Sequence, residues 1–170
     1  MKKIIIATIG IIIILLIAVT FEKQVESKLQ QEQANTQNPV ISVNSNNIVN
    51  LSDKGLTQIP SSVFNETNTE ELNVSNNALT GSIQSQIGQL RNLKILNASN
   101  NNMTGVPAEI GQLSKLEVLD LSNNELTGLP NELGNLSNLK VLNLSGNQYS
   151  IQDLNTIREN LPSAVEIITE

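Results

Sequence analysis

Leucines and other apolar residues recur in the second half of the chain at fixed places within a unit of 23 or 24 residues. Residues 116–130 read L-x-x-L-x-L-x-x-N-x-L-T-G-L-P, and residues 93–107 and 139–149 repeat this pattern one unit earlier and one unit later. A fixed period of this kind is typical of a stacked solenoid, in which each coil buries its apolar side against its neighbours. Places in the unit are counted below from its first leucine, Leu116.

Three places of the unit, the fourth, sixth and eleventh, are apolar in nearly every copy. We expect these side chains to stack into one core, and places three to five to form short strands of a parallel sheet. The three columns are, in order, Val49, Leu72, Leu96, Leu119 and Leu142; Leu51, Val74, Ala98, Leu121 and Leu144; and Leu56, Leu79, Met103, Leu126 and Tyr149.

The ninth place is asparagine in all copies but the first, where Lys54 stands. An asparagine amide can donate to and accept from backbone groups that a tight turn leaves unpaired. We therefore predict a structural ladder rather than a ligand site for Asn77, Asn101, Asn124 and Asn147.

The turn beyond the core columns reads T-G-x-P in residues 104–107 and 127–130, and I-G-x-L or L-G-x-L follows in residues 110–113 and 133–136. With these residues the chain resembles the plant-type and related bacterial leucine-rich repeat proteins, over roughly residues 46–170. The resemblance implies an α/β solenoid with a parallel sheet on its concave side and a mostly irregular or 3-10 convex side. The second coil has one extra residue near Ser82, which predicts a small bulge there.

The end of the chain predicts a helix–strand cap of the kind common in bacterial leucine-rich repeat proteins. Ser150 and Asp153 have the spacing of a capping box, and Pro162 ends the predicted helix. Val165 lies 23 residues after Leu142, so we expect residues 164–168 to form a last strand. The buried face of the helix is predicted to hold Leu154, Ile157 and Leu161.

The first 21 residues predict a signal anchor or transmembrane helix. Residues 4–21 carry no charge and would span about 27 Å as a helix, close to the thickness of the hydrocarbon layer. Lys2 and Lys3 predict a cytoplasmic N-terminus, with the repeat domain outside. A cleaved signal peptide, which would give a secreted protein, stays open, because Ala18 and Thr20 only weakly match a cleavage site.

Residues 22–39 are polar and are interpreted as a stalk or linker before the repeat domain, residues 40–170. This stalk has a sparse apolar stripe, so it stays open whether the stalk pairs with that of another copy of the chain. Residues 40–43 and 48–51 alternate apolar and polar side chains, which is a weak hairpin signal. We interpret this region as the N-terminal cap of the solenoid.

Composition removes several classes of function. The chain contains no Cys and no His, and its net charge is -6. The repeat part alone, from residue 41, holds 13 acidic and 6 basic residues. An acidic surface disfavours nucleic acid as a partner. No residue pattern supplies a nucleophile with a base, a paired acid and base, a metal site or a cofactor site, so we expect no enzyme.

The concave face offers the candidate binding site. Its third place is mostly apolar and its fifth place is Asn or Asp, and we expect the Ser of the seventh place and the residue of the eighth to point outward as well. Exposed apolar rows mark interaction sites, although strand propensity alone also produces them. We predict weak partner binding through Ile95, Val118, Val141, Asn73, Asn97, Asp120 and Asn143.

Together these features predict a membrane-anchored, extracytoplasmic module that binds an unknown protein or cell-surface ligand. Two other functions stay open: a structural protein that associates with its own copies, and an ice- or glycan-binding repeat that uses its regular Asn and Ser rows.

Overall fold

The computed structural model describes residues 23–24 and 47–170. By its contacts the chain divides into two units, residues 1–39 and 40–170, and the repeats lie in the second. The predicted anchor (1–21), nearly all of the predicted stalk and the predicted strand 40–43 lie outside the described residues. Within the part that is described, no helix is long and apolar enough to cross a membrane.

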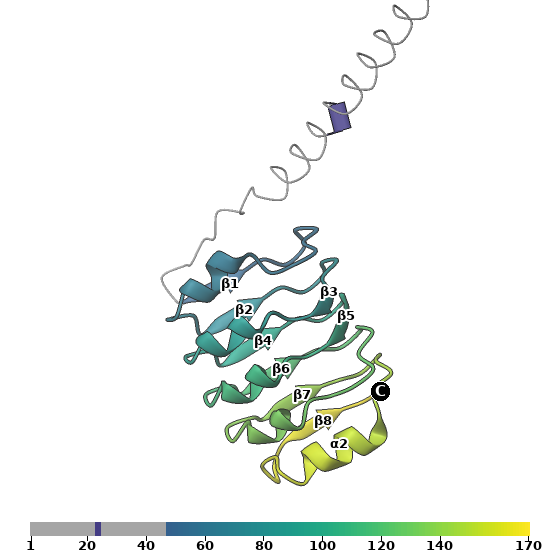
Figure 1. Cartoon of the computed structure of the whole chain (residues 1–170). Helices are drawn as coiled ribbons and strands as arrows, with labels where there is room; N and C mark the ends of the chain where they lie inside the picture. Colours follow the sequence, from purple (N-terminus) through teal and green to yellow (C-terminus); the bar gives the residue numbers. More distant parts are fainter. Residues whose placement is uncertain (1–22, 25–46) are drawn as a thin grey trace, which may run out of the picture. The chain divides into compact units, whose positions relative to one another are not determined.

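Six short strands form one parallel sheet, in the order β1-β2-β4-β6-β7-β8 (Figure 1). The first five occupy places three to five of successive coils, as predicted. The pairing aligns the fourth-place residues, so that Val49 lies beside Leu72, Leu72 beside Leu96, and so on to Leu142. The strands are β1 (Ile48–Asn50), β2 (Glu71–Asn73), β4 (Ile95–Asn97), β6 (Val118–Asp120), β7 (Val141–Asn143) and β8 (Glu166–Ile168).

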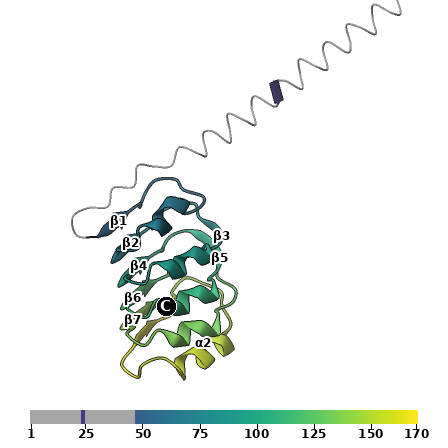
Figure 2. The ribbon, with the colours of Figure 1, turned by 60° about the vertical axis from the view of Figure 1, so that its left-hand side comes forward.

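The opposite side of each of the first four coils is a single 3-10 turn (Figure 2), which confirms the predicted convex side. Pro60, Pro107 and Pro130 stand immediately before three of these turns. Proline suits this place because its ring fixes φ and it has no N–H that would need a partner. The turns are η1 (Ser61–Asn65), η2 (Ser85–Gln89), η3 (Ala108–Gln112) and η4 (Asn131–Asn135).

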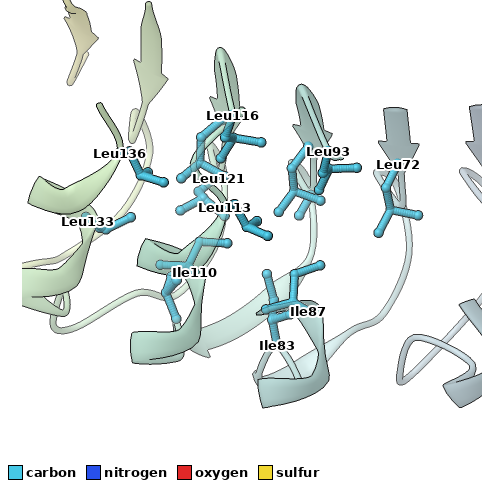
Figure 3. Packing of buried hydrophobic residues seen from close by; sticks show 14 of the residues in the cluster. Leu72, Ile83, Ile87, Leu93, Ile110, Leu113, Leu116, Leu121, Leu133 and Leu136 are labelled. Carbon is cyan, nitrogen blue, oxygen red and sulfur yellow. The ribbon is translucent and has the colours of Figure 1, made fainter. Parts of the chain in front are cut away.

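The core lies between the sheet and the 3-10 turns (Figure 3). All fourth-place side chains are fully buried, and so are Val74, Ala98, Leu121 and Leu144 of the sixth place. Residues that the sequence analysis did not assign complete the core from the convex side, among them Ile87, Ile110 and Leu133. The strands and turns of each coil contact those of the neighbouring coils, so one continuous core runs through the stack, as in a solenoid.

A second, two-stranded sheet joins β3 (Thr80–Ser82) to β5 (Asn102–Gly105). Its register shifts between Gly81 and Ser82, where a bulge was predicted, but the residue left without a partner in the pairing is Thr104 of β5 and not one of the second coil.

The C-terminal cap begins with α2 (Ile151–Arg158), whose N-cap Ser150 accepts a hydrogen bond from the Gln152 N–H at 3.1 Å. Asp153 does not complete the predicted capping box, because its carboxylate accepts instead from the Leu129 N–H at 3.4 Å. Leu154 and Ile157 of α2 are buried, as predicted. Leu161 is buried too, but it lies beyond the helix, which ends at Arg158 and not at Pro162 as predicted.

The last strand lies within the predicted residues 164–168, but its predicted register was wrong by two residues. Strand β8 begins at Glu166, and Ile167 rather than Val165 pairs with Leu142. The earlier coils cross the convex side in a 3-10 turn of five residues, whereas this one uses an α-helix of eight. An α-helix rises about 1.5 Å per residue and a 3-10 helix about 2.0 Å, so the α-helical path needs more residues.

The single tyrosine of the chain reports on this cap. Tyr149 is half-buried against the core, and burial raises the pKa of its phenol above 10.0, although the charge of Arg158 opposes the shift. Neutral tyrosine is therefore favoured in the folded state, and this contribution to stability is lost as pH rises through the raised pKa. We expect the absorbance titration of the native chain at alkaline pH to have a higher midpoint than that of the unfolded chain. An identical midpoint would contradict this placement of Tyr149.

Candidate concave binding face

The third-place side chains form a row across the concave face of the sheet. Strand pairing places them in the order Ile48, Glu71, Ile95, Val118, Val141, Glu166. Ile95 is 36% exposed, and Val118 and Val141 are half-buried. We call Ile95, Val118 and Val141 the apolar row. A glutamate flanks the row at each end, and Glu71 separates it from Ile48.

The fifth-place side chains lie beside the apolar row in one fixed orientation. In each of the five coils, the Oδ1 atom accepts hydrogen bonds from both the N–H and the hydroxyl of the serine two residues later. In Asn97 these distances are 3.1 and 2.7 Å, and in Asp120 they are 2.9 and 2.7 Å. Asn73 and Asn143 make the same pair of bonds. Because Oδ1 is engaged, the side-chain Nδ2 groups of these asparagines are left as donors toward solvent.

The same bonds correct the predicted seventh-place row. Ser75, Ser99 and Ser122 are only 5–6% exposed, so they do not present an outward hydroxyl ladder. Their hydroxyls donate to the fifth-place oxygen instead.

The residues of the eighth place are exposed, as predicted, and their residue types also suit the backbone conformation of the turn. Asp53, Asn76, Asn100, Asn123 and Gly146 all have positive φ, between 53° and 69°. Asn, Asp and Gly adopt this left-handed conformation more readily than other residues. The sequence contains a signal for this conformation, because the eighth place is Asn, Asp or, at residue 146, Gly in every coil.

The ninth-place asparagines bond to the backbone of their own coil and of the coil before it. Asn124 accepts from the Met103 N–H at 3.0 Å and donates to the carbonyl oxygens of Ala98 and Leu121, both at 3.0 Å. Equivalent bonds are made by Asn77, Asn101 and Asn147. These side chains point into the structure and not toward a ligand.

Charged side chains of the second place run beside the apolar row as two ion pairs. Lys94 Nζ lies 2.6 Å from Glu70, and Lys140 Nζ lies 2.6 Å from Glu117. The hydrogen bond and the charge of Glu70 raise the pKa of Lys94, and those of Lys140 lower the pKa of Glu117. Both pairs are exposed, so their contribution to stability is small. Their effect on the face is to neutralise the two lysines nearest the row.

Residues 47–170 contain no group of three or more acidic side chains placed to hold a metal ion. A hollow of about 30 Å³ among Thr57, Leu79 and Met103 has room for little more than a water molecule.

Comparisons with known proteins support a binding scaffold. Residues 70–163 match the family model of a leucine-rich repeat region. Among curated proteins no match was found. Among solved structures, a leucine-rich repeat protein of Leptospira interrogans is 40% identical, with a TM-score of 0.61, over 65% of this chain and 28% of that one.

Two ectodomains of Arabidopsis thaliana receptor kinases are also similar. That of SOBIR1 is 28% identical, with a TM-score of 0.57, over 71% of this chain and 67% of that one. That of GASSHO1/SCHENGEN3, solved in complex with CASPARIAN STRIP INTEGRITY FACTOR 2, is 32% identical, with a TM-score of 0.56, over 66% of this chain and 14% of that one.

The match to the Leptospira protein covers less than a third of that protein's length. Leucine-rich repeat domains are generally binding scaffolds without catalytic activity. Because the family model matches more than half of the chain, and the stacked coils and the asparagine ladder agree with it, the chain belongs to the leucine-rich repeat family.

Proposed function

We propose that the chain is a membrane-anchored, extracytoplasmic binding protein whose concave face holds an extended segment of another protein. The observation that carries the proposal is the apolar row, which is partly exposed beside fifth-place Asn and Asp side chains that the serines hold in one orientation. Fixed donors bind an extended backbone at a low entropic cost. The complex of the GASSHO1/SCHENGEN3 ectodomain is consistent with this use of the fold.

The anchored, extracytoplasmic location rests on the sequence alone. Residues 4–21 are uncharged and follow two lysines, which is the pattern of an anchor with its N-terminus in the cytoplasm.

The test compares two sets of surface substitutions in the full chain. A library of random 12-residue peptides is selected on the wild-type protein, and the affinities of the selected peptides are measured. Changing Ile95, Val118 and Val141 together to Ser is expected to weaken binding at least tenfold, because burial of each side chain contributes about 1 kcal/mol. The matched control is Ile151→Ser, which removes an apolar side chain that is 66% exposed on α2, away from this face.

Equal losses in the triple variant and the control, or no loss in either, would rule out the concave face as the site. The alternative function, an ice- or glycan-binding repeat, required exposed rows of both Asn and Ser. Three of the serines are buried, so the Ser row is not available for such binding.

A further inference from the structure

The uncompensated charge of the concave face is negative. Glu71 and Glu166 flank the apolar row, and Asp120 lies beside its centre. In residues 47–170 the ion pairs are Lys94–Glu70 and Lys140–Glu117, so none of these three carboxylates is paired with a cation. The third and fifth places contain no Lys or Arg in any coil.

The orientation of Asp120 adds to this field. Its Oδ1 atom accepts from the N–H and the hydroxyl of Ser122, which holds the carboxylate in place. One carboxylate oxygen is occupied in this way, and Oδ2 is left for a partner. A cationic group of a ligand would therefore meet a fixed acceptor beside Val118.

The distance between the two flanking glutamates sets the length of the ligand segment that could contact both. Four strand-to-strand steps separate Glu71 from Glu166, through Ile95, Val118 and Val141. At about 4.8 Å per step, the separation is about 19 Å. Six residues of an extended chain span about 20 Å, and every second side chain of such a chain faces the same way.

From this match we propose that the preferred partner is an extended segment with the pattern basic-x-apolar-x-apolar-x-basic, lying along the apolar row. Its two apolar side chains contact the row, and its two Lys or Arg side chains reach Glu71 and Glu166. The side-chain amides of Asn97 and Asn143 donate to its backbone carbonyls. This inference rests on the proposed function and names the chemistry of its ligand.

The experiment uses the full chain in non-ionic detergent and three synthetic peptides that share the same apolar core. One peptide has lysine at both ends of the pattern, one has glutamine there and one has glutamate. Fluorescence anisotropy at 50 mM NaCl gives the affinities. We expect the order lysine, glutamine, glutamate, with about fivefold between the first two, because two exposed charge pairs contribute modestly. The advantage of lysine should largely vanish at 500 mM NaCl, where exposed charges are screened.

Two double variants with equal changes in net charge locate the effect. Glu71→Gln with Glu166→Gln is expected to remove the preference for lysine ends. Glu132→Gln with Glu159→Gln, two exposed residues on η4 and just after α2, should leave it unchanged.

The outcomes of the experiment distinguish a failure of this inference from a failure of the proposed function. Peptides with glutamine or glutamate ends that bind as well as the lysine peptide overturn the charge pattern. If the serine substitutions of the apolar row still abolish their binding, the concave site itself stands. Lysine peptides that bind equally well to the apolar-row variant overturn both. Failure of all three peptides to bind also overturns the inference, and the peptide selection then decides on the site.

Discussion

Replacing Asn124 with Ala is expected to lower the free energy of unfolding by about 3 kcal/mol. The side chain is 4% exposed and bonds to one backbone N–H and three backbone carbonyls. The Met103 N–H would be left buried without its acceptor. The Ala98 and Leu121 carbonyls would each lose one of two donors, the others being Asn101 and Asn147. For a domain of this size, the loss corresponds to a fall in Tm of roughly 10 °C.

The matched control is Asn102→Ala, in the preceding coil. Asn102 is exposed and its amide donates to Glu125 Oε1 at 3.2 Å. Its replacement should change the free energy of unfolding by about 0.5 kcal/mol or less. Urea unfolding followed by circular dichroism measures both variants. Similar midpoints for the two would show that the ninth-place bonds do not stabilise the stack.

The second large effect is expected at Gly111, where replacement by Ala should cost about 3 kcal/mol. A Cβ atom there would lie 2.4 Å from the Glu132 backbone oxygen and 2.9 Å from Glu132 Cβ. The oxygen belongs to η4, which packs directly on the turn that holds Gly111, η3. Relief of the clash would therefore require the two coils to separate on their convex side. Alanine has the better helical propensity, so a loss of stability would be a packing effect.

Gly105→Ala is the control for this substitution. The nearest atom to its added Cβ is Ser82 Cβ at 3.7 Å, an ordinary contact. Chemical unfolding should show a lower midpoint for the Gly111 variant and a nearly unchanged one for the Gly105 variant. Unchanged stability in both would mean that the convex turns can move apart without cost.

Most of the fold could be predicted from the sequence because each coil repeats the same local pattern. The inward columns, the strands and the 3-10 turns all follow from residues at fixed places, such as Leu72, Leu96 and Leu119. The register of β8 could not be predicted by counting, because α2 replaces a 3-10 turn and changes the length of the path.

The candidate site was harder to predict because polar side chains of the repeat have several roles. Ser99 and Ser122 looked like surface residues, but their hydroxyls are bonded inward to the fifth place. Asn100 and Asn123 are exposed, as predicted, but their positive φ gives the backbone a separate reason for Asn at this place. The alternation of residues in a strand predicts the face of the sheet on which a polar side chain starts. Only the hydrogen bonds in the structure show whether its donors and acceptors point to solvent or back to the protein. The apolar row and the fifth-place residues Asn73, Asn97, Asp120 and Asn143 stay predicted binding residues.

The central claim is that ligands bind on the concave sheet face, and methyl chemical shifts test it most directly. The full chain, labelled at Ile and Val methyl groups, is titrated with the lysine-ended peptide. The account predicts that the largest shift changes occur at Ile95, Val118 and Val141, with little change at Ile151 on α2 or at Ile87 and Ile110 on the convex side. Larger changes at Ile151, Ile87 or Ile110 than at the apolar row would contradict it.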